Sequence, residues 1–145
     1  MLPEMTRALP DIQDEQDTRG IALDSVGVAG VRTPIRITDG EVDAAGVGSA
    51  EFVVTLASDR RGTHMSRMVE TIATELREFD PRGAAALVAA AADRLGAARA
   101  RISFDLPVSF EVRAPVSDVP AWQAADVNFS VEGSAESPAM TTTLT

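Results

Sequence analysis

The spacing of hydrophobic residues changes along the chain, and each spacing predicts a different kind of element. In 31–37 the apolar residues alternate with polar ones, and a second alternating run covers 52–56. A period of two is that of a β-strand with one buried face. Asp39-Gly40 lies between the two runs as a turn signal. We therefore expect a β-hairpin with a longish loop.

From Met65 onwards the apolar period becomes that of an amphipathic α-helix. Its predicted apolar stripe consists of Met65, Met68, Val69, Ile72, Leu76 and Phe79. Core packing is the expected use of both methionines. Asp80-Pro81 favours the end of this helix and the start of another, because Asp caps helices and Pro is tolerated in the first turn. The second helix has the stripe Ala84, Leu87, Val88, Ala91, Leu95 and Ala98.

Period two returns over 101–112, which is the clearest strand in the sequence. Pro107 interrupts it without an N–H to donate, so we expect a sheet edge or a bulge there. Further strands are predicted over 127–131 and 139–145, with Trp122 at a sheet margin or interface. The order ββααββ(β) predicts an α+β fold. Its antiparallel sheet has one apolar face covered by both helices, and its other face meets water or another subunit.

Composition narrows the class of protein. The chain has 145 residues, enough for one domain with its own core. Residues 1–20 are polar, acidic and proline-bearing and are expected to form a flexible arm, with the folded unit in 21–145. A net charge of -9 argues against nucleic acid as a partner. The sequence has no membrane-spanning run and no signal sequence, so we expect a soluble cytoplasmic protein with no membrane partner.

The candidate chemistry is concentrated in 59–67, which holds the only histidine, His64. The chain has no cysteine, so its donor set for a metal is poor. A helix start with flanking arginines could receive a phosphate or carboxylate on Gly62 and Thr63. The arginines are Arg60, Arg61 and Arg67. The alternative is that they are only solvated and that Thr63 is a helix N-cap.

Several blocks of this sequence resemble GTP cyclohydrolases of type IB. In chain order they are Asp-Thr-Arg-Gly at 17–20, Ala-Leu-Asp-Ser-Val-Gly-Val at 22–28, Pro-Ile at 34–35, Arg-Gly-Thr-His-Met-Ser-Arg at 61–67 and Ala-Pro-Val-Ser at 114–117. They span most of the chain in the family's order. The chain therefore resembles this family, which belongs to the tunnelling-fold superfamily.

The resemblance implies a tunnelling fold, whose units associate through their sheets into a barrel and bind purines or pterins at subunit boundaries. It implies a homo-oligomer joined through sheet edges, with GTP as the substrate. The implied activity is metal-dependent hydrolytic opening of the GTP purine ring to formate and 7,8-dihydroneopterin triphosphate, in folate or pterin biosynthesis. The implied cofactor is a divalent metal, Zn, Mn or Fe.

The sequence departs from the family where the metal site begins. In the family a Cys-Pro-Cys-Ser-Lys block follows a strand resembling 141–144, whereas this sequence stops at Thr145. The later histidine and glutamate ligands and a second unit of the same fold are missing too. We therefore expect this chain to be the N-terminal unit of such an enzyme. It is expected to hold no catalytic and no metal-binding residue and to be inactive by itself. The alternative is a non-catalytic tunnelling-fold module that assembles or binds a purine.

For substrate contacts the resemblance favours the block 61–67. Arg61 and Arg67 suit triphosphate oxygens, and His64 and Ser66 would add shorter contacts. Each role has an alternative. His64 could be a surface or capping residue. The block at 17–20 could bind ligand or act as a latch that pins the arm to a neighbouring subunit.

Overall fold

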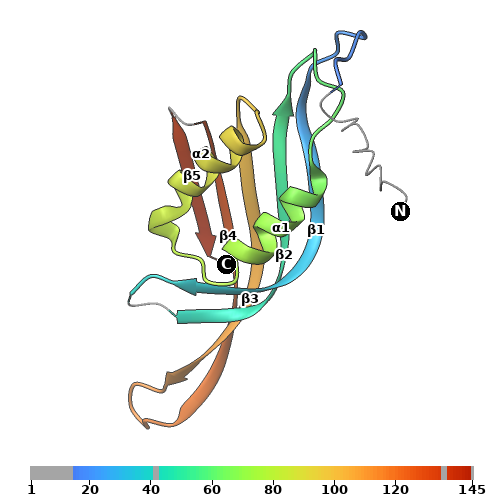
Figure 1. The fold of residues 1–145 in the computed structure, drawn as a ribbon. Coiled ribbons are helices and arrows are strands. Elements are labelled where there is room, and N and C mark those ends of the chain that lie inside the picture. Colours follow the sequence, from blue (N-terminus) through green and yellow to red (C-terminus); the bar gives the residue numbers. More distant parts are fainter. Residues whose placement is uncertain (1–14, 41–42, 135–136, 145) are drawn as a thin grey trace, which may run out of the picture.

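The computed structural model describes residues 15–40, 43–134 and 137–144. They form one antiparallel sheet in the order β1-β2-β3-β4-β5, with two helices on one of its faces (Figure 1). The elements are β1 Leu23–Thr38, β2 Asp43–Leu56, α1 Met65–Glu75, a 3₁₀ turn Pro81–Gly83, α2 Ala84–Arg94, β3 Ala100–Arg113, β4 Pro120–Gly133 and β5 Pro138–Leu144. The predicted α+β tunnelling fold, with both helices on one face, is confirmed.

The first hairpin is longer than the sequence suggested. β1 and β2 pair as far as Thr38 and Asp43, so the prediction of a longish loop is wrong. Gly46 and Gly48 lie within β2. A Cβ at Gly48 would lie 2.6 Å from both the Asp105 carbonyl oxygen and the Cδ1 of Ile35. Close packing inside the sheet therefore requires glycine at position 48, and this glycine does not mark a turn.

The core lies between the sheet and the two helices. Its largest fully buried side chains are Phe52, Phe79, Ile35, Met68, Ile72, Leu76, Ile102, Leu106, Val88 and Val131. Phe79 stands edge-on to Phe129, with ring centroids 4.8 Å apart, and edge-on to Phe104 at 5.3 Å. These aromatic contacts connect the segment after α1 to the central strands β3 and β4.

The apolar stripe of α1 is narrower than predicted. Met68 and Ile72 are buried, whereas Met65 is 45% exposed and Val69 is 42% exposed, so core packing of Met65 is wrong. The helix ends at Glu75, and the chain after it runs along the outer edge of β1. There the Phe79 N–H donates to the Arg36 carbonyl oxygen at 2.7 Å. The sheet therefore contacts α1 through the Met68 side only.

The second helix begins as the sequence predicts. The Asp80 carboxylate accepts a hydrogen bond from the Arg82 N–H at 2.9 Å, and Pro81 occupies the first turn. A short 3₁₀ turn leads directly into α2, which ends at Arg94. Ala98 lies beyond this end and is exposed, so its place in the predicted stripe is wrong. Within the described residues, no helix is long and apolar enough to span a membrane.

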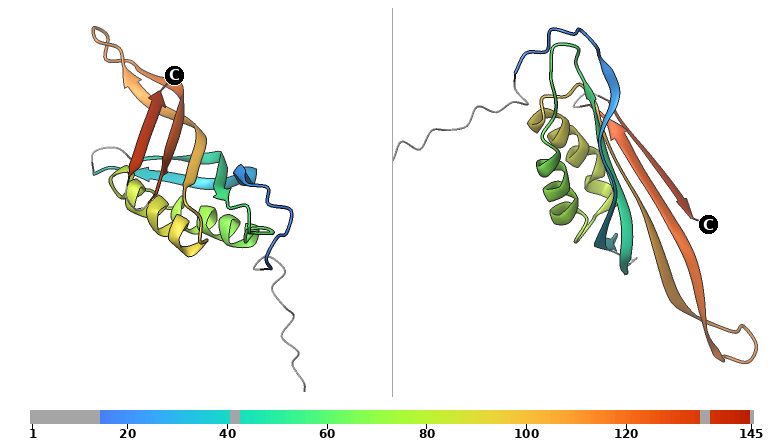
Figure 2. Two further views of the ribbon diagram at one scale, coloured as in Figure 1. Left: turned by 90° about the horizontal axis from the view of Figure 1, so that it is seen from above. Right: turned by 90° about the vertical axis from the view of Figure 1, so that its right-hand side faces the viewer.

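β3 and β4 extend beyond the rest of the sheet as a two-stranded ribbon (Figure 2). β2 pairs with β3 only from Ala100 to Asp105, whereas β4 stays paired with β3 as far as Arg113. Pro107 therefore lies where β3 has lost its β2 neighbour, and the predicted edge position is confirmed. Trp122 lies near the start of β4 on this ribbon and is 75% exposed.

Candidate functional site

The connection between β2 and α1 carries the block 61–67. The chain leaves β2 at Leu56, and His64 occupies the N-cap position of α1. The His64 side chain makes no capping hydrogen bond to the helix. Neither Thr63 as the N-cap nor side-chain capping by His64 is therefore observed. The first turn of α1 contains no acidic residue, so the positive end of the helix dipole has no carboxylate of its own helix beside it.

Thr63 is the buried member of this loop. It is 6% exposed, and its Oγ1 has no hydrogen-bond partner among the described residues. A buried hydroxyl without a partner loses its bonds to water and gains none in return. Sequence reasoning missed this because the motif gives only residue types, while burial of the side chain depends on the packing of the loop.

The four predicted substrate-binding residues lie on one short stretch but do not converge on one another. Arg61, Ser66 and Arg67 are exposed, and His64 is partly exposed. No hydrogen bond or ion pair joins Arg61 to Ser66 or Arg67 in the described part of the chain. The Arg67 guanidinium likewise has no ion-pair partner there. The structure thus offers two exposed guanidinium groups at a helix start, with Arg61 before the helix and Arg67 in its first turn.

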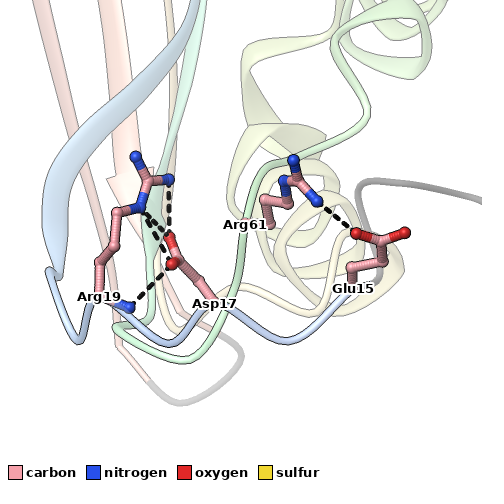
Figure 3. Close-up of polar contacts among 4 residues, drawn as sticks. All are labelled: Glu15, Asp17, Arg19 and Arg61. Carbon is pink, nitrogen blue, oxygen red and sulfur yellow. Dashed lines mark hydrogen bonds and ion pairs between the residues drawn. The ribbon is translucent and has the colours of Figure 1, made fainter.

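Arg61 forms an ion pair with Glu15 (Figure 3). The two residues are separated by 46 positions in the sequence. Their side chains remain about half exposed, at 52% and 46%. Sequence reasoning missed this contact, because Glu15 lies in the predicted arm and no local pattern connects it to the loop.

The segment 15–20 is held beside the loop by backbone contacts. The Asp17 N–H donates to the Asp59 carbonyl oxygen at 2.9 Å, and Gln16 forms an isolated β-bridge with Arg60. The block 17–20 thereby lies next to the loop of the block 61–67. The rest of the predicted arm, 1–14, lies outside the described residues.

Asp17 and Arg19 form a turn closed on itself. The Asp17 carboxylate accepts hydrogen bonds from the Arg19 backbone N–H at 2.9 Å, from Nε at 3.0 Å and from Nη2 at 2.8 Å. These bonds from Arg19 lower the pKa of Asp17 below its ordinary value of 3.8. The Asp17 and Arg19 side chains are thus engaged with each other, and the segment contacts a loop of the same chain. Ligand binding by this block and a latch to a neighbouring subunit both stay predictions.

Arg60 lies beside the turn that follows α2. Its guanidinium lies beside Gly96, after the end of α2. A Cβ added to Gly96 would lie 2.6 Å from Nη2 of Arg60. A positive charge near a helix C-terminus is favourable. We therefore assign Arg60 a structural role and leave it out of the candidate site.

The block 114–117 lies far from the other motifs, at the tip of the ribbon and at the opposite end of the sheet from the 57–64 loop (Figure 1). Its turn is closed by the Asp118 N–H, which donates to the Ala114 carbonyl oxygen at 3.0 Å, and by an ion pair between Arg113 and Asp118. Val116 is 99% exposed. Within one chain this block has no part in the loop site.

A polar depression lies on the sheet face opposite the helices. Its volume is about 410 Å³, and its polar lining comes from Ser49, Glu51, Arg101, Ser103, Asp105, Asn128 and Ser130. The charged side chains of this lining already have partners within the chain. Arg101 contacts Glu51 at 3.0 Å, and the Asn128 amide donates to the Asp105 carboxylate. From the sequence we expected this face of the sheet to meet water or another subunit, and we did not predict a depression on it.

The residues present do not fit a catalytic metal centre. In the part of the chain that the structure describes, no three His, Asp or Glu side chains are grouped to hold a metal ion. The whole sequence has one histidine and no cysteine. The divalent metal implied by the resemblance therefore has no ligand set in the described residues.

Comparison with known proteins decides the family. The family model described as type I GTP cyclohydrolase FolE2 matches residues 9–145. The chain belongs to this family. The type I GTP cyclohydrolase resemblance drawn from the motifs is confirmed at this level. The finer subclass IB appears in none of the names and stays a prediction.

Individual relatives agree with the FolE2 assignment. The chain is 38% identical over 113 residues to GTP cyclohydrolase FolE2 of Methylococcus capsulatus, covering 77% of this chain and 42% of the relative. It is 31% identical over 134 residues to FolE2 of Aromatoleum aromaticum, covering 91% and 49%. For FolE2 of Magnetococcus marinus the identity is 35% over 123 residues, covering 84% and 46%. The chain thus spans about half the length of these curated relatives.

Proposed function

We propose that this FolE2 chain supplies substrate-side contacts to a GTP cyclohydrolase of subclass IB. The reaction would be metal-dependent hydrolytic opening of the GTP purine ring, giving formate and 7,8-dihydroneopterin triphosphate for folate or pterin biosynthesis in the cytoplasm. The family match over residues 9–145 carries this proposal. In it, 21–145 is the first of two tunnelling-fold units, and the relatives' greater length supports this division.

The proposed contacts are to the triphosphate. Arg61 and Arg67 present guanidinium groups that can each bind phosphate oxygens in bidentate fashion. They flank a helix start whose first turn has no acidic residue, which favours an anion there. His64 and Ser66 would add shorter hydrogen bonds. None of these residues is assigned a role in breaking the purine ring.

The metal belongs to the proposal only as a requirement of the family. A divalent Zn, Mn or Fe ion would supply an activated water for attack on the purine ring. The donor set among the described residues does not fit such an ion, so no residue of this chain is assigned a role at the metal. The proposal places the metal ligands outside the chain, as the sequence resemblance implies.

We further propose that the unit acts in a homo-oligomer joined through sheet edges. Along β1, the segment after α1 already covers the edge at 36–38. In the described residues no strand pairs with the outer edge of β5 or with the β2 side of β3 beyond Asp105. These stretches present backbone groups that another subunit could pair with. The acidic charge of the chain argues against nucleic acid in the assembly.

The test compares this chain with a version extended by its downstream reading frame. Both receive GTP with added Zn²⁺ or Mn²⁺, and formate release and dihydroneopterin fluorescence are measured. Activity in the extended protein alone supports the proposal. In that protein Arg67→Ala should weaken GTP binding more than it lowers fold stability. An unchanged Michaelis constant and turnover would remove Arg67 from the site.

The alternative is a non-catalytic tunnelling-fold module that assembles or binds a purine. The sequence favours it in one respect, since the chain has one histidine and no cysteine. A stop codon directly after Thr145 would favour this alternative. Where the reading frame continues, the absence of formate release from both proteins would favour it.

A further inference from the structure

We propose that Glu15 is an internal competitor for the anion that Arg61 binds. The inference rests on the proposed role of Arg61 in binding the triphosphate. It adds that the site is regulated by its own chain, because a carboxylate already lies on the guanidinium that a phosphate would contact (Figure 3). A phosphate group and a carboxylate offer guanidinium the same kind of paired oxygens.

The position of Glu15 is fixed by its neighbours. Gln16 is bridged to Arg60, and the Asp17 N–H is bonded to the Asp59 carbonyl oxygen. Both contacts lie within two residues of Glu15 on one side and within two residues of Arg61 on the other. The carboxylate is thus presented at a high effective concentration, since the tether spares it a search through solution.

Arg19 does not divert Glu15 from Arg61. The Arg19 guanidinium is held by Asp17 through Nε and Nη2. The two acidic residues therefore each have their own arginine, and Figure 3 shows the two pairs side by side. The Asp17 pair stabilises the turn, while the Glu15 pair covers the proposed ligand group.

The Glu15–Arg61 pair is weak enough to open. Both side chains are about half exposed, so water and salt reduce their attraction. A ligand must displace Glu15 before it can contact Arg61. Its apparent affinity is therefore its intrinsic affinity multiplied by the fraction of molecules in which Glu15 does not cover Arg61. For an exposed pair this corresponds to a loss of roughly two- to fivefold. The same linkage requires that a bound polyphosphate release Glu15 from the loop.

The experiment measures binding of inorganic tripolyphosphate to the 145-residue chain by titration calorimetry at low ionic strength. Glu15→Gln keeps the size of the side chain and removes its charge, so it should tighten binding about two- to fivefold. Arg61→Ala should weaken binding, and in that background Glu15→Gln should bring no gain. Glu111→Gln, on the ribbon, makes the same charge change and should leave the dissociation constant unchanged.

The remaining outcomes separate the two ideas. If Arg61→Ala weakens binding but Glu15→Gln does not tighten it, the competitor is rejected and the anion site remains. If Glu15→Gln and Glu111→Gln tighten binding equally, the effect is one of net charge, and the competitor is again rejected. If tripolyphosphate does not bind, or binds equally well to Arg61→Ala, two ideas are rejected. One is the proposed role of Arg61 in binding the triphosphate, and the other is competition by Glu15.

Discussion

The Arg60 guanidinium lies beside Gly96, at a position where a Cβ on the glycine would come within 2.6 Å of Nη2. Gly96 also has a positive φ of 61°, a backbone conformation that residues other than glycine adopt only at a cost in free energy. This contact joins the loop before α1 to the turn after α2. The loop before α1 and the turn after α2 therefore lie side by side through a residue pair that the sequence motifs did not connect.

Replacing Gly96 by alanine should lower the free energy of unfolding by about 1–2 kcal/mol. The guanidinium can swing aside, so the strain of the left-handed backbone sets most of this cost. Gly83→Ala is the matched control, because no atom lies within 4 Å of its added Cβ and its φ is -86°. Urea unfolding of both variants measures the difference. Equal stabilities would show that the turn at Gly96 adapts without strain.

The sequence predicted the elements whose patterns are local. The strand over 101–112 and the helical spacing around Met68 and Ile72 are each confirmed. The alternation of burial that sets the strand period holds as far as Leu106, whereas Phe110 on the ribbon is 43% exposed. The length of β2 was not predictable in this way. Position 48 in β2 is a glycine because Ile35 and Asp105 approach it closely from the neighbouring strands. This close approach cannot be read from the local sequence.

The candidate site was predictable as a stretch of chain but not as an arrangement. The motif identified Arg61 and Arg67 and the start of a helix. It did not show that Glu15 covers Arg61, that Thr63 is buried or that Arg60 lies against α2. Each of these depends on contacts between distant segments. The four proposed substrate contacts themselves remain predictions.

Thr63→Val should leave the protein as stable as before or raise its free energy of unfolding by about 1 kcal/mol. Valine has nearly the shape of threonine, and the hydroxyl it replaces is buried without a partner in the described residues. Thr71→Val is the contrasting variant. Its Oγ1 donates to the Arg67 carbonyl oxygen at 2.8 Å, so its loss should cost roughly 0.5–1.5 kcal/mol. Denaturant unfolding compares the two, and a larger loss for Thr63→Val would contradict the assignment.

The stability contributed by Asp17 should depend on acid pH. Its hydrogen bonds from Arg19 lower the folded-state pKa below 3.8. A group with a depressed folded pKa stabilises the fold fully above its unfolded pKa of about 3.9, and this contribution disappears as pH falls through the folded value. Asp17→Asn should therefore be less stable than the parent at pH 7 and approach the parent's stability as pH falls below the folded-state pKa of Asp17.

Thermal unfolding between pH 2.5 and 7 measures this convergence. Asp24→Asn serves as the control, because Asp24 is exposed and has no ion pair among the described residues. A constant difference between Asp17→Asn and the parent across this range would mean that the carboxylate charge is not what stabilises the turn. Loss of the Asp17 turn should also loosen residues 15–20 from the 59–60 backbone.

We expect the isolated chain to self-associate through the exposed β3–β4 ribbon. An isolated two-stranded hairpin is marginal in water, and exposed apolar side chains favour contacts between molecules. Val116 is 99% exposed at the tip, and Trp122 is 75% exposed near the start of β4. We expect the apparent mass in light scattering to rise with protein concentration. The double variant Val116→Ser and Trp122→Thr should reduce this rise without shifting the unfolding midpoint, since neither residue lies in the core.

Val47→Thr is the matched control for this prediction. Val47 is an exposed valine on β2, outside the ribbon. Its replacement removes one exposed valine from β2, as the Val116 change removes one from the tip of the ribbon. It should leave association unchanged if the ribbon is the contact surface. Equal reductions from both variants would instead indicate general hydrophobic association. A clean monomer of the parent chain at high concentration would contradict the prediction outright, and would mean that the ribbon and the open strand edges are stable in water as they are.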